Sequence, residues 1–139
     1  MNKVKDKSDA EEAQYKLFQD FVAPDFMNTV QKVVDIGRKA DPMKWSVQDV
    51  ICKLLEEAGE FSEAIQNKVG KIHKNLEPDA DFDEAADAII CVIDGLSQAN
   101  LDVPRDYLVY KLQQSIIKKS KKWEAKIDLY TAKDDIYGN

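Results

Sequence analysis

The chain has few of the residues that interrupt helices or that mark a secreted protein: five glycines, four prolines and two cysteines among 139 residues. So few glycines and prolines favour a helical fold, because these residues are the commonest punctuation of turns and loops. Cys52 and Cys91 both lie in apolar stretches, and without secretion signals they predict reduced, buried thiols in a cytoplasmic protein. A chain of this length suits one domain with its own core.

Several kinds of chemistry lack the residues that they need. His73 is the one histidine, and no serine or cysteine stands in a pattern that would pair with it in nucleophilic catalysis. No glycine-rich phosphate loop and no internal repeat is found, and neither a signal peptide nor a membrane span is expected. The net charge of −6 and the pI near 4.8 disfavour nucleic acid or an anionic membrane as the main partner.

Two stretches carry acidic residues among regularly spaced apolar ones, residues 54–65 (LLEEAGEFSEAI) and residues 82–96 (FDEAADAIICVIDGL). Apolar residues recur in both at steps of three and four, which predicts two helices. Side chains three residues apart lie on one face of a helix, about 60° apart. If the two helices are antiparallel, they bring together the carboxylates of Glu57, Glu60, Glu84 and Asp87.

These four carboxylates predict a divalent metal site, because a set of oxygen donors suits Mg²⁺ or Mn²⁺ and suits zinc poorly. Six apolar residues follow Asp87 and cover the whole circumference of their helix, so we expect Asp87 to point into the protein. Glu56 falls opposite the apolar stripe of the first helix, which indicates a supporting or surface position. The alternative is that the acids are solvated residues near helix starts, where Lys53 and Lys68 are possible ion-pair partners.

The pattern E-E-x-x-E at Glu56, Glu57 and Glu60, followed after 23 residues by E-x-x-D at Glu84 and Asp87, resembles the motif of the MazG family. That family belongs to the all-α nucleoside triphosphate pyrophosphohydrolases, and the resemblance covers roughly residues 26–123. It implies a four-helix-bundle core of the MazG-like type, Mg²⁺ as cofactor with Mn²⁺ as a substitute, and a homodimer or homotetramer. The implied reaction converts a nucleoside triphosphate to the monophosphate and pyrophosphate, by attack of a metal-activated water on the α-phosphorus.

The resemblance also assigns roles to single residues. The candidate catalytic residues are Glu56, Glu57 and Glu60, and the candidate metal ligands are Glu57, Glu60, Glu84 and Asp87. Glu56 or Glu63 would orient the attacking water. Trp45 is a candidate contact to the base, with a core or hinge position as the alternative. Lys118 and Lys121 share a helix face and are candidates for binding the triphosphate, with a simple charge complement to the helix C-terminus as the alternative.

Caps and helix breakers predict the remaining elements. Asp25 should cap a helix over residues 26–39, Ser46 should cap the first acidic helix, and Gly70 should end it. Pro104 should open a last helix that ends near residue 122. The expected organisation is an N-terminal helical extension (1–24), a MazG-like domain (25–124) and a polar tail (125–139). The side chains expected to face inward include Phe26, Val30, Val33, Val34, Leu108, Leu112, Ile116 and Ile117.

Two further functions stay open. The first is a dCTP- or dUTP-type pyrophosphatase, or a phosphoribosyl-ATP pyrophosphohydrolase, of the same superfamily. The second is a non-catalytic acidic helical protein that binds a partner. An enzyme should need Mg²⁺ and should release pyrophosphate, whereas a binding protein would do neither.

Overall fold

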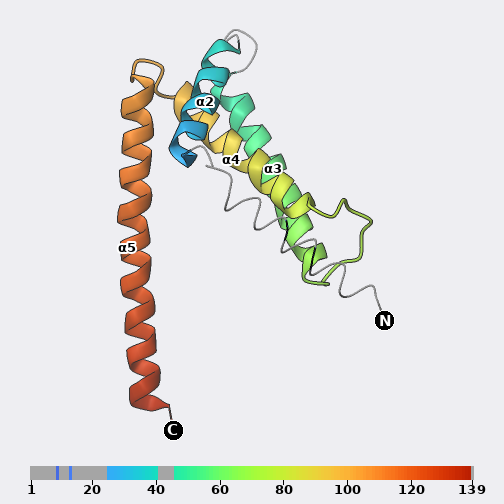
Figure 1. The fold of residues 1–139 in the computed structure, drawn as a ribbon, viewed down its shortest axis with the longest axis vertical. Coiled ribbons are helices and arrows are strands. Elements are labelled where there is room, and N and C mark those ends of the chain that lie inside the picture. The colour runs from blue at the N-terminus through green and yellow to red at the C-terminus, as the bar shows by residue number, and fades with distance from the viewer. Residues whose placement is uncertain (1–8, 10–12, 14–24, 41–45, 139) are drawn as a thin grey trace.

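The computed structural model describes residues 25–40 and 46–138, together with Asp9 and Ala13. This part of the chain forms four helices and no strand: α2 (Phe26–Lys39), α3 (Val47–Lys68), α4 (Ala80–Gln98) and α5 (Arg105–Tyr137) (Figure 1). The prediction of an all-α fold is therefore confirmed. Among the described helices, none combines the length and the apolar character that crossing a bilayer requires. The predicted N-terminal helix, apart from Asp9 and Ala13, and the candidate residue Trp45 lie outside the described residues.

Local sequence sets the helix boundaries. The carboxylate of Asp25 accepts a hydrogen bond from the backbone N–H of Met27 (3.1 Å) at the start of α2. Ser46 and Asp49 form a capping box at the start of α3, in which each side chain accepts the backbone N–H of the other residue. Gly70 adopts φ 77° just after α3, a left-handed conformation that favours glycine. The two predicted caps and the predicted stop are confirmed.

Helices α3 and α4 form an antiparallel pair, the most extensive helix contact in the described structure. At one end, Lys68 Nζ lies 3.6 Å from Asp81 Oδ2. At the other end, Gly95 lies so close to α3 that a Cβ on it would sit 3.4 Å from a methyl group of Val50. Residue numbers therefore rise along α3 as they fall along α4, which is the arrangement that the acidic motif requires.

The hydrophobic core lies where α2 crosses α4 and meets the first turns of α5. Arg38 of α2 ties these elements together: its guanidinium donates hydrogen bonds to Ser97 Oγ (3.0 Å) and to the carbonyl oxygens of Asn100 (3.2 Å) and Val103 (2.7 Å). The core thus occupies the end of α4 that is far from Ala80. Its buried members are Val30, Val34, Ile93, Leu108 and Val109.

Helix α5 is longer than the sequence predicted. It continues through the expected polar tail to Tyr137, and every described side chain after Leu112 is exposed. Figure 1 shows this half of α5, in orange and red, running apart from the α3–α4 pair. Ile116 and Ile117, predicted to face inward, are 54% and 41% exposed. Helical periodicity identified an apolar face correctly, but it does not say whether the same chain covers that face.

Three other burial predictions are also wrong within one chain. Phe26 at the start of α2 is exposed, and Cys52 is exposed while Cys91 is half-buried. Helix α4 is not covered on all sides, because Ile89, Ile90 and Val92 are each nearly half exposed. The reason is that α2 and α3 pack against only part of its circumference.

Candidate metal centre

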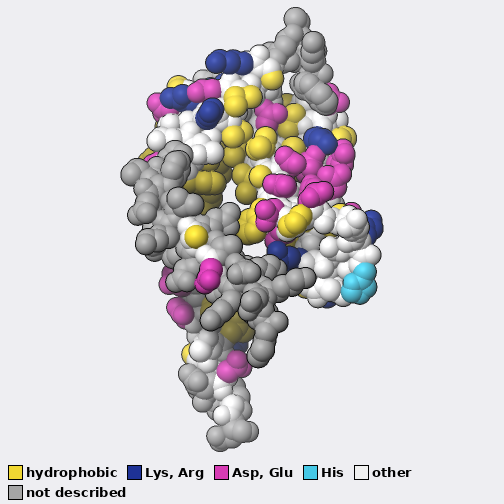
Figure 2. All heavy atoms as spheres, turned by 45° about the vertical axis from the view of Figure 1, so that its right-hand side comes forward, with side chains coloured by type: hydrophobic (Ala, Val, Ile, Leu, Met, Phe, Trp, Pro, Cys, Tyr) yellow, Lys and Arg dark blue, Asp and Glu magenta, His cyan; other side chains and the backbone are white. Residues whose placement is uncertain are grey.

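Three of the predicted ligands converge between α3 and α4. Glu57 and Glu60 of α3 and Glu84 of α4 each offer a carboxylate oxygen, and these oxygens all lie within 4.8 Å of one another. Glu57 is only 5% exposed, Glu84 is half-buried and Glu60 is exposed. Figure 2 shows acidic side chains gathered on one face of the molecule, beside hydrophobic ones. The group thus has a buried side within the helix pair and an open side toward solvent.

Two oxygens of this group lack, among the described residues, the partner that a buried charge needs. Glu57 Oε2 and Glu84 Oε2 are both buried, and neither has a hydrogen-bond partner in residues 25–40 and 46–138. Such atoms are rare in folded proteins, because removing a charged oxygen from water without compensation is costly. A divalent cation between the two helices would compensate both oxygens at once. The donors present, all hard carboxylate oxygens, fit Mg²⁺ or Mn²⁺.

The carboxyl of Glu84 also feels the negative charge of its neighbours. Burial raises the pKa of the Glu84 carboxyl above its ordinary value, and the neighbouring carboxylates of Glu60, Asp87 and Glu57 raise this pKa further. A hydrogen bond with the Glu60 side chain acts in the same direction. The group therefore holds either a proton or a cation more readily than an isolated glutamate would.

One lysine already contacts the group. Lys53 Nζ lies 2.5 Å from Glu57 Oε1 and 3.2 Å from Glu56 Oε1. The hydrogen bonds with Glu57 and Glu56 raise the pKa of the Lys53 ammonium, so it carries its charge throughout the neutral range. Glu57 is therefore shared: its carboxylate contacts Lys53 and also belongs to the three converging acids. Glu56 is exposed, contacts Lys53 and is not one of the three converging acids.

Asp87 differs from its prediction. It is exposed rather than turned into the protein, and it is not one of the three converging carboxylates. It still lies close enough to raise the pKa of Glu84. The physical reason is that Glu84 faces α3, whereas Asp87 is turned about 60° further around α4, toward a side that no described helix covers.

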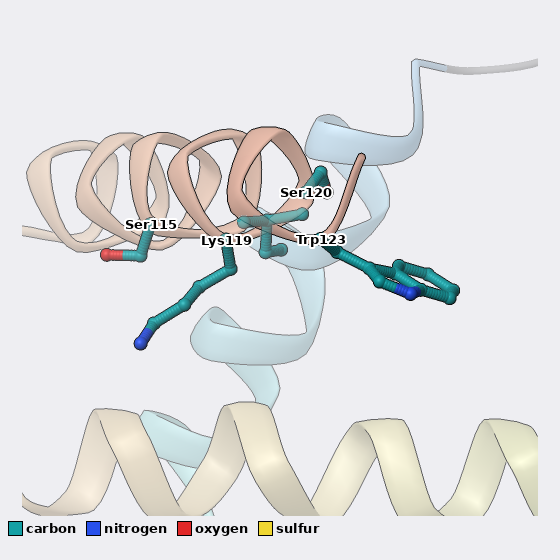
Figure 3. Close-up of a pocket in the computed structure, with 5 residues that line it drawn as sticks. Ser115, Lys119, Ser120 and Trp123 are labelled. Atoms are coloured by element: carbon teal, nitrogen blue, oxygen red, sulfur yellow. The ribbon is translucent and has the colours of Figure 1, made fainter. Parts of the chain in front are cut away.

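The structure does not bring the predicted phosphate-binding lysines to the acids within one chain. Lys118 and Lys121 are exposed on the half of α5 that runs apart from the α3–α4 pair (Figure 1). A hollow of about 440 Å³ lies on this half of α5, and Figure 3 shows the side chains that line it. All of the lining residues that the structure describes come from α5 itself, so in the described part of the chain it is a helix surface rather than a cleft with converging groups. These residues are Ser115, Ile116, Lys119, Ser120 and Trp123.

Two features near the acids had weaker signals in the sequence. Lys53 is predicted only as a partner of a solvated acid, although its position four residues before Glu57 indicates a contact with that side chain. Asp81, one turn before Glu84, is predicted only as one of the acids at the helix start, whereas its Oδ1 is buried with no hydrogen-bond partner in the described part of the chain. Glu63, a candidate for orienting water, forms an ion pair with Lys74.

Comparison of the chain with protein-family models, with curated proteins and with solved structures finds no match. The residues and their geometry therefore carry the functional argument. They define an all-α protein in which two antiparallel helices enclose a partly buried group of three carboxylates.

Proposed function

We propose that this protein is a metal-dependent hydrolase, and in particular a Mg²⁺-dependent nucleoside triphosphate pyrophosphohydrolase of the MazG-like type. One observation carries the proposal: Glu57, Glu60 and Glu84 converge, with two buried oxygens that have no hydrogen-bond partner among the described residues. These three residues belong to the motif that resembles the MazG family, so the sequence pattern and the geometry point to the same site.

Glu57, Glu60 and Glu84 would hold the metal, and Asp87, beside Glu84, would complete the set from the solvent side. Mg²⁺ or Mn²⁺ bound there would neutralise triphosphate oxygens and lower the pKa of a bound water. Glu57 and Glu60 would act through the metal, whereas exposed Glu56 is free on its solvent side to orient the attacking water. The products would be a nucleoside monophosphate and pyrophosphate. The free thiols of Cys52 and Cys91 support a cytoplasmic protein.

We also propose that the protein works as a homodimer or a homotetramer. One face of the α3–α4 pair exposes a set of large apolar side chains around a groove of about 420 Å³. Contiguous apolar surface of this kind marks an interaction site in soluble proteins. A second copy would cover this face, and it would add its own Lys118 and Lys121 to the surroundings of the acids. Ile51 (45% exposed) and Val92 (48%) line this groove, and Leu55 (70%) and Ile89 (47%) are exposed on the same two helices.

A non-catalytic partner-binding protein is the second candidate. The part of α5 after Leu112 favours it, because its described side chains are exposed. Trp123 and Tyr130 are 69% and 63% exposed there, and aromatic side chains of this kind commonly anchor protein contacts. A protein of that kind would bind through α5 and would leave nucleotides intact.

Pyrophosphate release from a panel of nucleoside triphosphates, with Mg²⁺ or with EDTA, tests the proposal and compares the dCTP, dUTP and phosphoribosyl-ATP alternatives directly. The wild type should release pyrophosphate only with the metal. Glu84→Gln should lower the rate at least about a hundredfold, because it removes a ligand charge at the centre of the group, and Asp87→Asn should lower it less. Glu124→Gln, an exposed change on α5, is the matched control and should keep full activity.

Two results would contradict the proposal. Nucleoside diphosphate and phosphate as the first products would exclude a pyrophosphohydrolase. No hydrolysis of any nucleotide with Mg²⁺ or Mn²⁺ would favour the partner-binding alternative.

A further inference from the structure

The ion pair between Lys53 and Glu57 is unusual for a helix surface. Lys53 precedes Glu57 by four residues, which is the less favourable order for a lysine and a glutamate on one helix. The lysine nevertheless reaches a carboxylate that is only 5% exposed and approaches its Oε1 to 2.5 Å. The Lys53 side chain itself is 47% exposed, so solvent alone could have satisfied it. The contact therefore stabilises the buried carboxylate of Glu57 more than it stabilises the ammonium of Lys53.

Glu57 links Lys53 to the acid group. Its Oε1 contacts the ammonium of Lys53, and its Oε2 is buried with no hydrogen-bond partner among the described residues. One of its carboxylate oxygens lies within 4.8 Å of oxygens of Glu60 and Glu84. A divalent ion held by this group would thus share one carboxylate with a lysine. Ion and ammonium would lie within a few ångströms of each other, where like charges repel strongly. In the metal-free protein the same ammonium attracts all three carboxylates and offsets their mutual repulsion.

We propose that Lys53 is the built-in counter-ion of the acid group: it holds Glu57 in place before the metal binds and lowers the affinity of the site for the metal. This inference rests on the proposed metal site. It assigns Lys53 a positioning role that sets how much free Mg²⁺ or Mn²⁺ the site needs. Lys53 keeps the Glu57 carboxylate in place while no metal is bound. In return, the acid group binds the metal more weakly than it would without the lysine.

The chain offers a matched control on the same helix. Lys68 is similarly exposed and pairs with Asp81 at 3.6 Å, outside the three converging acids. It lies eight residues after Glu60, the nearest of the three acids in the sequence of α3, which is about 12 Å along the helix. This exceeds the screening length of about 8 Å at physiological ionic strength. Lys68→Met therefore removes the same charge from the same helix without removing it from the site.

The test measures the Kd for Mn²⁺ binding to the full chain in two ways. One is isothermal titration calorimetry, and the other is electron paramagnetic resonance, which reports the concentration of free Mn²⁺. Lys53→Met should tighten the Kd about tenfold or more, because a repelling charge next to the ion is lost. Lys53→Arg, which keeps the charge, and Lys68→Met should both stay within about threefold of the wild type. In EDTA, Lys53→Met should melt below the wild type, and Mn²⁺ should raise its melting temperature by more.

Each other outcome overturns the inference. If Mn²⁺ binds the wild type and Lys53→Met binds it equally or more weakly, Lys53 is not a competing counter-ion, although the metal site stands. If the wild type binds no Mn²⁺ at millimolar concentration, the proposed function fails as well. Circular dichroism checks that Lys53→Met folds. If Lys53→Met does not fold, Lys53→Arg decides instead. Its Kd for Mn²⁺ should match that of the wild type, and a difference of more than about threefold would contradict the inference.

Discussion

Adding Mg²⁺ to the metal-free protein should raise its melting temperature by about 9 °C at a hundredfold excess over the Kd. A ligand that binds only the folded state stabilises it by about 2.7 kcal/mol at that excess. An unfolding entropy of about 2.1 cal/mol/K per residue gives about 0.29 kcal/mol/K for 139 residues, which sets the shift in temperature. The structural basis is the pair of buried oxygens, Glu57 Oε2 and Glu84 Oε2, which only the folded chain brings together.

The assay is a thermal melt followed by circular dichroism, with EDTA and with a series of Mg²⁺ concentrations. Glu84→Gln should lose most of the shift, because it removes one of the two uncompensated oxygens. Glu124→Gln carries the same chemical change on exposed α5 and should keep the full shift. Equal melting temperatures for the wild type with and without Mg²⁺, or equal shifts in all three proteins, would show that these acids do not form a metal site.

Two more predictions follow from the acids and from the apolar face. In EDTA, the unfolding free energy should fall as the pH rises from about 4.5 through the raised pKa of Glu84, because the folded protein holds that proton more tightly than the unfolded chain does. Guanidine unfolding at several pH values should show a flatter profile for Glu84→Gln, and identical profiles would refute this cause. Light scattering should give the wild type a multiple of 15.8 kDa. Leu55→Glu should lower that mass and Leu129→Glu on α5 should not, while a wild-type mass of 15.8 kDa would contradict the oligomer.

The sequence predicted the described elements well wherever local chemistry decides. The bounds of α2 follow from Asp25 and the apolar spacing, and the start of α3 follows from Ser46, because capping is an interaction between near neighbours in the chain. The convergence of Glu57 and Glu60 with Glu84 was also predictable. It requires only that the two helices are antiparallel and in register, because residues at i and i+3 lie on the same face of a helix.

What the sequence could not predict depends on how much of each helix its neighbours cover. Asp87 was expected inside because the residues after it are apolar all round, yet Asp87 is exposed and no described helix covers that side of α4. Ile116 and Ile117 carry a real apolar periodicity on a half of α5 that packs against none of the other described helices. Apolar periodicity identifies the face of a helix that is suited to burial. Which element or subunit buries that face depends on the assembled molecule.

The two ends of helix α4 have different surroundings. Ile93 and Ser97 anchor one end in the core, whereas Glu84 serves the acid group near the other end, and Ser97 is about 20 Å from Glu84 along the axis. Substitutions at such separations, without shared partners, usually have additive effects on stability. The acid end can thus change its charge with little effect on the folding energy that the core end supplies. A scaffold of this kind can acquire new chemistry through a few substitutions on one helix pair.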